Sequence, residues 1–303
     1  GTAALVSPQS WLFQEFYSSF RRSYLEGVEW DIVARLGTRA FDEISGEKVN
    51  VALLSLTRRS PDADSQFLGL DASDGDGART KARNLLNSEP LRVKQRRQAA
   101  HPGSIVSFED LSGKRQLSRD AYCYQGTSTG DNPRFTRSFW ELDRAGKWEP
   151  FQKSADSHEL FAGRATFVDW SWLQSDGSGA AIRGHEAWGQ EGLALGQMQQ
   201  VPATIYHGVK FSNSTPVLIP NQNTSLAALW CFCTSGRMYE SLRALNKKLS
   251  IDNGYINKIS WDRAHWEKIA EQKYPDGLPD PYSDDPTQWI FHGHPKPSER
   301  PLQ

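Results

Sequence analysis

The residues best suited to contact another molecule lie in a turn-forming segment, residues 125–135, which is rich in Gly, Ser, Thr and Asp. Its small residues, Thr129 among them, and Asn132 allow the backbone to approach a second molecule closely. Arg134 and, just beyond the segment, Arg137 are suited to bind phosphates and the edges of bases. A tight surface loop before a strand is the alternative, and composition alone favours it.

Positive charge gathers in a second segment, which we expect to form a basic helix over residues 78–99. Against a single acid, Glu89, it carries Arg79, Lys81, Arg83, Arg92, Lys94, Arg96 and Arg97. A solvated helix face is the common explanation of such a charge run, but phosphate contact requires a surface of this kind. The chain as a whole has a formal net charge of −1, which argues against a dedicated nucleic-acid binder.

Cys231 and Cys233, with His292 and His294, are the residue types of a zinc site. The cysteines fall in an apolar run predicted to be helical, where their spacing points the side chains apart. We therefore interpret them as core cysteines and predict no metal site. Three cysteines form no even disulfide set, which favours a reducing cytoplasm. The longest apolar run, residues 226–233, is too short to cross a bilayer, so no membrane is expected.

The elements expected around these groups begin with an α/β segment over residues 1–58. Its apolar runs predict strands at 3–6, 30–36 and 49–56, and a helix at 10–26. This helix is expected to pack an aromatic stripe on the sheet and to keep Arg21 and Arg22 off that stripe. The stripe consists of Phe13, Phe16, Tyr17, Phe20 and Tyr24.

The rest of the chain is expected to be an α+β region that follows a linker. Residues 60–77, rich in Ser, Asp, Gly and Pro, are typical of a loop. Short strands are expected at 105–108, 135–142, 165–170, 180–183, 204–211, 217–219 and 255–259. Helices are expected at 226–233, at 237–249 and from a cap at Ser260 or Asp262 to about residue 273.

The turn segment opens a longer pattern, Gly-x-x-Thr-Gly-x-Asn-x-x-Phe-x-Arg-x-x-Trp-Glu. The matched positions are Gly126, Thr129, Gly130, Asn132, Phe135, Arg137, Trp140 and Glu141. This pattern resembles the entry to the target-recognition domain of large adenine-specific DNA methyltransferases of the PglX-like and type IIG-like kind. Such enzymes serve restriction-modification and phage-exclusion systems.

Two further blocks resemble the same family. Residues 6–13, 34–37, 40–46 and 49–54 are similar to the closing strands of its catalytic domain. Residues 266–279 and 284–289 are similar to the later part of its recognition domain. The resemblance therefore spans nearly the whole chain.

The resemblance implies that Phe41 stacks on an adenine turned out of the duplex, because a flipped base needs a flat apolar partner. Packing under the sheet is the alternative for this residue. The family's Asn-Pro-Pro-Tyr group and its Phe-x-Gly-x-Gly turn, which serves the methyl donor, do not occur in the sequence. We therefore expect S-adenosylmethionine to act in the intact enzyme, and no cofactor and no DNA methylation in this chain by itself.

Together these features predict an α/β part followed by an α+β part, namely the C-terminal portion of a Rossmann-like methyltransferase sheet joined to a mixed target-recognition domain. The expected bounds are 1–58 for the methyltransferase elements, 59–103 for a linker with the basic helix, and 104–303 for a recognition domain that is incomplete at its C-terminus.

The predicted function is recognition of double-stranded DNA for a site-specific N6-adenine methyltransferase. The basic segment and Thr129, Asn132, Arg134 and Arg137 are the expected DNA contacts. Catalysis is expected from a missing N-terminal part of the same polypeptide. The alternative is a protein-interaction module without DNA binding, which would use the aromatic surface from Trp140 to Trp188.

Overall fold

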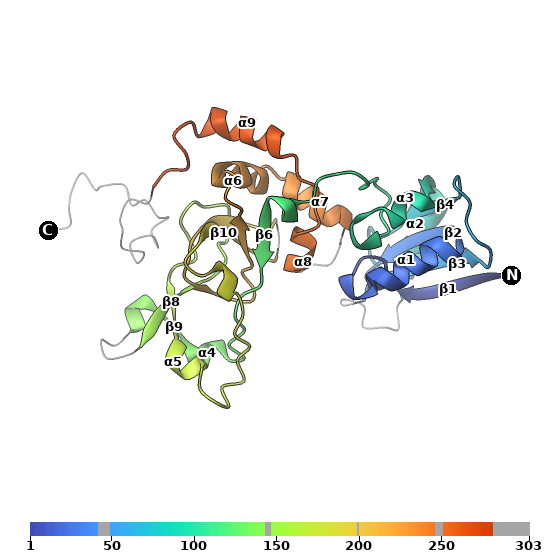
Figure 1. The fold of residues 1–303 in the computed structure, drawn as a ribbon. Helices are drawn as coiled ribbons and strands as arrows, with labels where there is room; N and C mark the ends of the chain where they lie inside the picture. The colour runs from blue at the N-terminus through green and yellow to red at the C-terminus, as the bar shows by residue number, and fades with distance from the viewer. Residues whose placement is uncertain (42–48, 143–146, 199, 246–250, 281–303) are drawn as a thin grey trace. The chain divides into compact units, whose positions relative to one another are not determined.

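The computed structural model describes residues 1–41, 49–142, 147–198, 200–245 and 251–280. By its contacts the chain divides into two compact units (Figure 1). The first unit is Gly1–Lys114 with Arg243–Lys248, and the second is Arg115–Leu242 with Leu249–Gln303.

The first unit is built on a five-stranded sheet with the order β1-β3-β2-β4-β5. The strands are β1 (Thr2–Pro8), β2 (Glu29–Gly37), β3 (Val51–Thr57), β4 (Gln66–Asp71) and β5 (Leu91–Lys94). β2 and β4 run parallel, and the other neighbours are antiparallel. The strands predicted at 3–6, 30–36 and 49–56 are confirmed as β1, β2 and β3, with small shifts of their ends.

The predicted loop at 60–77 and the predicted helix at 78–99 are confirmed only in part, because each is interrupted by a strand. Residues 66–71 form β4, where Gly69 leaves room for the ring of Phe108, 2.8 Å from the place that a Cβ would take. The predicted helix is divided into α2 (Ala78–Asn87), β5 and α3 (Gln95–Ala99). Pro90 cannot continue a helix, and the residues that follow it pair with β4. The assignment of 1–58, 59–103 and 104–303 to domains stays a prediction.

The predicted helix at 10–26 begins as two short 3-10 turns, η1 (Gln9–Leu12) and η2 (Glu15–Tyr17), before α1 (Ser18–Gly27). α1 turns Arg21 inward, where it is fully buried. The Arg21 guanidinium donates hydrogen bonds of 2.6–3.1 Å to four backbone carbonyls, those of Trp11, Gln14, Gly103 and Ser104. Turn carbonyls without helical partners need such donors, so this arginine takes the inner position.

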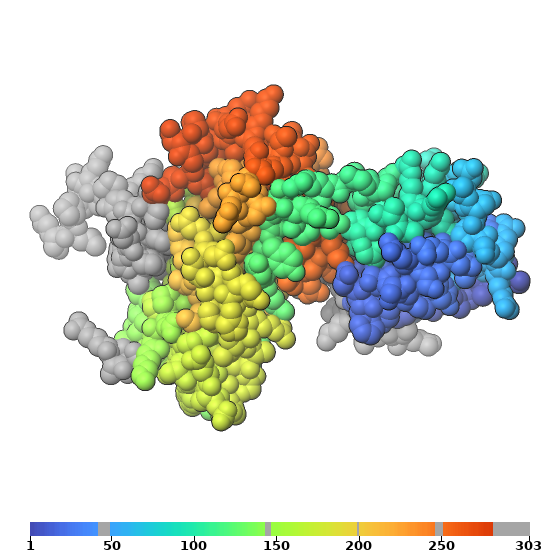
Figure 2. Space-filling model, viewed as in Figure 1, coloured from blue at the N-terminus to red at the C-terminus, as the bar shows by residue number. Residues whose placement is uncertain are grey.

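The aromatic stripe predicted to pack on the sheet is therefore largely exposed. Phe16 is 87% exposed, Phe20 46% and Tyr24 36%, whereas Phe13 is buried. In the space-filling view the α1 segment, in blue, lies at the surface of the first unit (Figure 2). The expectation that this stripe faces the sheet is wrong, because Arg21 and Leu25 are the buried residues of α1.

The second unit contains two four-stranded sheets, with the orders β11-β10-β13-β6 and β12-β8-β9-β7. The first sheet consists of β6 (Ala121–Tyr124), β10 (Glu191–Leu195), β11 (Ala203–His207) and β13 (Val217–Pro220). The second consists of β7 (Thr136–Ser138), β8 (Trp148–Gln152), β9 (Thr166–Asp169) and β12 (Lys210–Phe211). Helices α4 (Asn132–Phe135) and α5 (Trp170–Leu173) border β7 and β9 in the chain.

The helices that follow are α6 (Leu226–Thr234), α7 (Arg237–Leu245), α8 (Asn253–Ile256) and α9 (Arg263–Lys273). α6 and α9 pack side by side (Figure 1). The predicted helices at 226–233 and 262–273 are confirmed, and the Asp262 carboxylate caps α9 by accepting from the backbone N–H of His265 at 3.1 Å. The predicted end of α7 at residue 249 lies outside the described residues.

The strands predicted at 165–170, 204–211 and 217–219 are confirmed as β9, as β11 with β12, and as β13. Residues 105–108 form no strand, and residues 180–183 contribute a single bridge. The strand predicted at 135–142 is instead the end of α4, then β7 and a 3-10 turn, because Asp131 caps a helix there. The strand predicted at 255–259 includes the end of α8. Strands β6, β8 and β10 were not predicted, since each is short and mixes polar with apolar residues.

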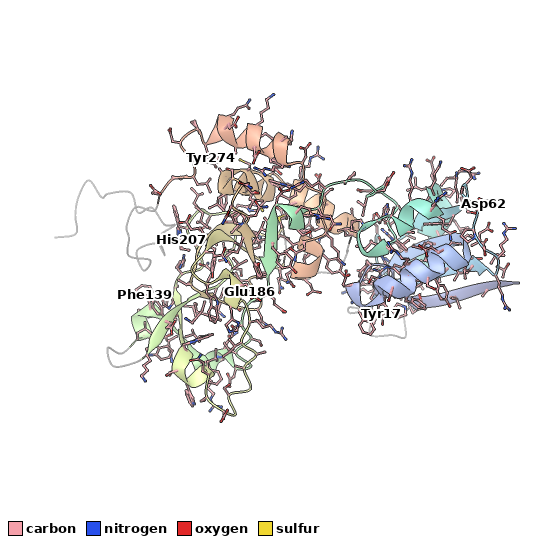
Figure 3. All side chains as sticks on the ribbon, viewed as in Figure 1. Tyr17, Asp62, Phe139, Glu186, His207 and Tyr274 are labelled. Carbon is pink, nitrogen blue, oxygen red and sulfur yellow. The ribbon has the colours of Figure 1, made fainter. Side chains whose placement is uncertain are left out.

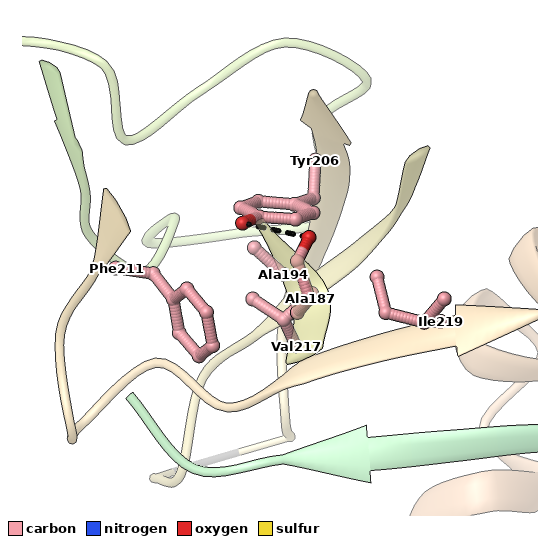
Figure 4. Packing of buried hydrophobic residues seen from close by; sticks show 6 residues of the cluster. All are labelled: Ala187, Ala194, Tyr206, Phe211, Val217 and Ile219. Atoms are coloured by element: carbon pink, nitrogen blue, oxygen red, sulfur yellow. Dashed lines mark hydrogen bonds between the residues drawn. The ribbon is translucent and has the colours of Figure 1, made fainter. Parts of the chain in front are cut away.

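Buried side chains from both sheets form the core of the second unit. One cluster consists of Ala187, Ala194, Tyr206, Phe211, Val217 and Ile219 (Figure 4). The Tyr206 hydroxyl donates to the carbonyl of Ala187 at 3.3 Å, which satisfies this polar atom inside the core. A second cluster, with Phe135, Phe151 and Trp170, lies against the β8-β9 part of the other sheet.

Candidate nucleic-acid interface

The turn segment is held from inside by its own backbone. The Thr127 N–H donates to the Phe211 carbonyl at 2.9 Å, and Ser128 exchanges hydrogen bonds of 3.0 and 2.8 Å with Ala181. A Cβ at Gly126 would overlap the backbone carbonyl oxygens of Phe211 and its neighbour Ser212. The small residues are expected to let a second molecule approach the backbone closely. At Gly126 the close approach is instead to strand β12 of the chain itself.

Thr129 and Asn132 position the start of α4. Thr129 is buried, and its hydroxyl donates to the side-chain oxygen of Asn132 at 2.8 Å. Asp131 caps the helix by accepting from the Arg134 N–H at 3.2 Å. The Lys153 ammonium lies 3.5 Å from the same Asn132 oxygen, and burial lowers the pKa of this lysine. Asn132 is exposed and open to a ligand, whereas the buried Thr129 holds the Asn132 side chain in place through this hydrogen bond.

Arg134 projects from α4 over the ring of Trp172. Its guanidinium carbon lies 4.6 Å from the ring centroid, and both side chains are exposed. An aromatic face holds an arginine in place and leaves its N–H donors available for an anion. Arg137 differs, since its guanidinium donates to the carbonyls of Pro133 and Thr136 at 2.6 and 2.7 Å. Arg134 is therefore the better placed of the two to meet a phosphate.

The basic segment is distributed over α2, β5 and α3. Exposed cations stand on all three elements, namely Arg79 and Arg83, Arg92 and Lys94, and Arg96 and Arg97. Arg97 forms an ion pair with Asp110. The other five exposed cations are referred to together as the basic surface of the first unit, and phosphate contact requires positive charge of this kind.

Lys81 does not belong to this surface. It is 2% exposed, and its ammonium donates to the backbone carbonyl of Ser73 at 2.6 Å, in the turn between β4 and α2. Its charge serves the fold, so its predicted DNA contact is not carried into our proposal.

Phe41 follows the end of β2 and is 39% exposed. Packing under the sheet, the alternative weighed for this residue, would require a buried ring. A partly exposed aromatic side chain is compatible with stacking on a base.

A cleft of about 670 Å³ in the second unit was not indicated by any sequence pattern. Its floor is β6, where the rings of Tyr122 and Tyr124 lie 4.9 Å apart. Its wall is the segment 182–186, whose exposed Arg183 donates to the side-chain oxygen of Gln125 at 2.9 Å. The two tyrosines two residues apart could have revealed the cleft, but β6 itself was not predicted.

Glycine at position 184 decides how this wall runs. Gly184 has a φ of +85°, and a Cβ there would meet the ring of Phe211 and the Gln125 carbonyl. Only glycine combines this conformation with this close packing. The turn brings Arg183, His185 and Glu186 to the cleft, and Glu186 is labelled in Figure 3.

Several other ionisable groups of the second unit are partly or fully buried. Burial and the neighbouring Arg164 lower the pKa of His207 to about 4, so the imidazole is neutral at physiological pH. Cys123, Cys231 and Cys233 are buried. In the part of the chain that the structure describes, no group of His, Cys, Asp or Glu side chains is placed to hold a metal ion. His292 and His294 lie outside that part.

None of the described helices has the length and apolar character needed to span a bilayer.

No protein-family profile matches the chain. Its fold is similar to that of a restriction-modification enzyme: the type IIL enzyme MmeI, solved in complex with DNA, superposes with a TM-score of 0.51 and 13% identity over 97% of this chain and 45% of that one. A nuclease-deletion mutant of the type ISP enzyme LlaGI, solved with a DNA substrate mimic, gives a TM-score of 0.47 at 9% identity over 90% of this chain and 35% of that one.

Among curated proteins, the chain is similar to the adenine-specific methyltransferase PglX of Lacticaseibacillus casei (strain Zhang). The two are 22% identical over 317 residues, which cover 89% of this chain and 26% of the relative. The resemblance to large adenine-specific DNA methyltransferases is thereby confirmed. The chain spans about a quarter of the length of this relative.

Proposed function

We propose that this chain is the DNA-recognition part of a site-specific adenine methyltransferase of a restriction-modification or phage-defence system. The observation that carries the proposal is the similarity to PglX along 89% of the chain, which involves both units. In the whole protein, S-adenosylmethionine would donate the methyl group to an adenine turned out of the duplex.

Exposed cations in both units support DNA binding. The first unit contributes the five basic side chains on α2, β5 and α3 outside the Arg97–Asp110 pair. The second contributes Arg134, held over Trp172 beside the exposed Asn132. Phosphate contacts of this kind supply the sequence-independent part of DNA affinity. Phe41 is the side chain that we propose to stack on the target adenine.

The first unit offers no fitting place for the methyl donor at its glycine-containing strand-to-helix turn, Asp71–Gly77. The Lys81 ammonium is bonded to the carbonyls of Ser73 and Asp74 inside that turn. Because the sequence also lacks the glycine turn and the Asn-Pro-Pro-Tyr group, we propose that donor binding and catalysis belong to another part of the whole protein and that this chain alone is inactive.

The exposed aromatic stripe of α1 is the surface that we propose to pack against that other part. It borders an apolar groove of about 330 Å³ between α1 and β1, lined by Leu5, Trp11, Phe20 and Tyr24 among others. β1 lies at the edge of the sheet, and Val6 in it is 63% exposed. A cluster of exposed aromatic side chains beside an open sheet edge is typical of a surface that a partner covers. We propose that the partner that covers this surface is the remainder of the catalytic domain. The similarity to a relative about four times as long supports this choice.

Salt-dependent binding of the 303-residue chain to a labelled mixed-sequence duplex, followed by fluorescence anisotropy, tests the function. The affinity should fall linearly on a logarithmic scale with salt concentration. Replacing Arg79, Arg83, Arg92, Lys94 and Arg96 with Gln should reduce the slope by about one for each phosphate that the variant no longer neutralises. Arg134→Ala should reduce it by about one as well.

Arg237→Gln is the matched control, since its side chain is 72% exposed, pairs with Glu240 on α7 and is not among the proposed DNA contacts. It should leave the slope unchanged. A chain that shows no salt-dependent binding would contradict the proposal and favour the protein-interaction alternative. That alternative has less support, because Trp170 and Trp188 pack in the fold and only Trp140 and Trp172 of the proposed aromatic surface are strongly exposed.

A further inference from the structure

The geometry of the cleft on β6 points to a further site: we infer that it reads the major-groove edge of a G·C base pair. This inference rests on the proposed DNA-recognition function and names residues for it. The cleft is lined by Tyr122, Cys123, Tyr124, Gln125, Ile182, Arg183, Gly184, His185, Glu186 and Asn253. Flat aromatic rings, amides and a guanidinium converge there, and these are the groups that contact bases.

The first argument is the pairing of Gln125 with Arg183. The Arg183 guanidinium donates to the Gln125 side-chain oxygen at 2.9 Å, which occupies a lone pair of that acceptor. The pair then presents mostly N–H donors, the amide nitrogen of Gln125 and the other N–H groups of Arg183. Guanine offers two adjacent acceptors, O6 and N7, in the major groove, and arginine is their usual partner.

The second argument is Glu186, three residues after Arg183 on the same wall of the cleft. Its carboxylate is exposed at the cleft, and its negative charge helps to raise the pKa of Tyr124 after the larger effect of burial. A carboxylate accepts hydrogen bonds from the amino group of cytosine in the major groove. Donors and an acceptor on one wall therefore match the two halves of a G·C pair.

The third argument is rigidity, which specific recognition needs. The wall is fixed by Gly184 against Phe211 and by Thr127, whose hydroxyl donates to the Arg183 carbonyl at 3.0 Å. The floor is fixed by Asn253, whose amide donates to the Cys123 carbonyl at 3.2 Å. The ring of His185 is held 4.4 Å from that of Trp188. The cleft is also continuous with the turn segment, because Gln125, which lines the cleft, is the first residue of that segment.

The test selects duplexes from a randomised library with the wild-type chain, Arg183→Ala, Gln125→Ala and Glu186→Ala, and sequences the bound fraction. The wild-type chain should enrich a motif that contains a G·C pair. Each cleft variant should lower the preference for that one pair by about tenfold or more and leave the other positions of the motif unchanged. Arg237→Ala, an exposed arginine of the same unit outside the cleft, should select the wild-type motif.

Two outcomes separate the inference from the function on which it rests. A wild-type chain that binds DNA while the cleft variants retain its full motif, or lose affinity equally for all sequences, overturns the G·C site and leaves the proposed function intact. A wild-type chain that binds no duplex overturns both. Circular dichroism of each variant should match the wild type, because Arg183 and Glu186 are exposed and Gln125 is only half-buried.

Discussion

At the scale of single residues, the family-like pattern marks a scaffold more than a set of contacts. Gly126 fits against the backbone of β12, Thr129 is buried under Asn132, and Phe135 is fully buried in the core. Glu141 closes a capping box with Ser138. Arg134, the side chain of this segment that we propose to meet DNA, occupies an unspecified position of the pattern. A residue in such a pattern can therefore serve to position a neighbouring side chain.

His207 gives a prediction at this scale. Because its pKa is lowered to about 4, the unfolded chain binds a proton that the folded chain does not between pH 6.5 and 4. Stability should therefore fall as the pH falls through this window, by about 2 kcal/mol between pH 7 and pH 5 from this group. Urea unfolding of wild type and His207→Gln at several pH values should show a flatter dependence in the variant.

The control for this prediction is His265→Gln, which removes an exposed histidine on α9. It reports the effect of losing a histidine at a site outside the core. Equal pH dependence in wild type and His207→Gln would mean that the half-buried imidazole of His207 contributes nothing to acid destabilisation.

At the scale of elements, the sequence predicts well where apolar runs are long and continuous. β2, β3 and α6 follow directly from such runs. The failures share a physical cause: tertiary contacts outweighed the preference that the local sequence pattern indicated. β4 forms in a Ser- and Asp-rich segment because β2 offers it a parallel edge, and α1 buries an arginine because four carbonyls need donors.

Gly126 gives a prediction at the element scale, because it joins the turn segment to β12. Gly126→Ala places a methyl group against two backbone carbonyls that cannot move independently of the strand. We expect a loss of about 1–3 kcal/mol in the free energy of unfolding, measured by urea denaturation. Gly254→Ala, where a Cβ meets open space, should change it by less than about 0.5 kcal/mol. Similar losses in both variants would rule out close packing as the reason for glycine at 126.

At the scale of the whole molecule, the first unit contains one sheet and the second contains two, and each unit has its own predicted DNA contacts. The first unit combines a basic surface with an exposed aromatic stripe, which suits an element set between DNA and a covering partner. The second unit combines Arg134 with a cleft of base-contacting side chains. We therefore propose a division of labour, with phosphate contact in both units and base reading in the second.

The aromatic stripe gives a prediction at this scale. The remainder of the whole protein, expressed separately, should bind the 303-residue chain. The double variant Phe16→Gln with Phe20→Gln should weaken that binding by about tenfold or more, because exposed aromatic side chains dominate such interfaces. Sedimentation velocity on the mixture measures it. Leu86→Gln, equally exposed at 87% on α2, is the control and should bind as the wild type does. Undiminished binding by the Phe variant would remove α1 from the interface.

The sequence by itself determined the relationship to adenine-specific methyltransferases, because that rests on residue identities such as Gly126, Asn132 and Trp140 in fixed spacing. It also determined the N-terminal strands β1, β2 and β3 and the later helices α6 and α9, whose apolar spacing is local. The tertiary structure alone decided that Lys81 and Arg21 are buried and that Phe16 is exposed, since the backbone carbonyls that accept from Lys81 and Arg21 lie outside the helices that carry these residues. It alone assembled the cleft, because Tyr122 and Arg183 meet only after strands far apart in the chain have paired.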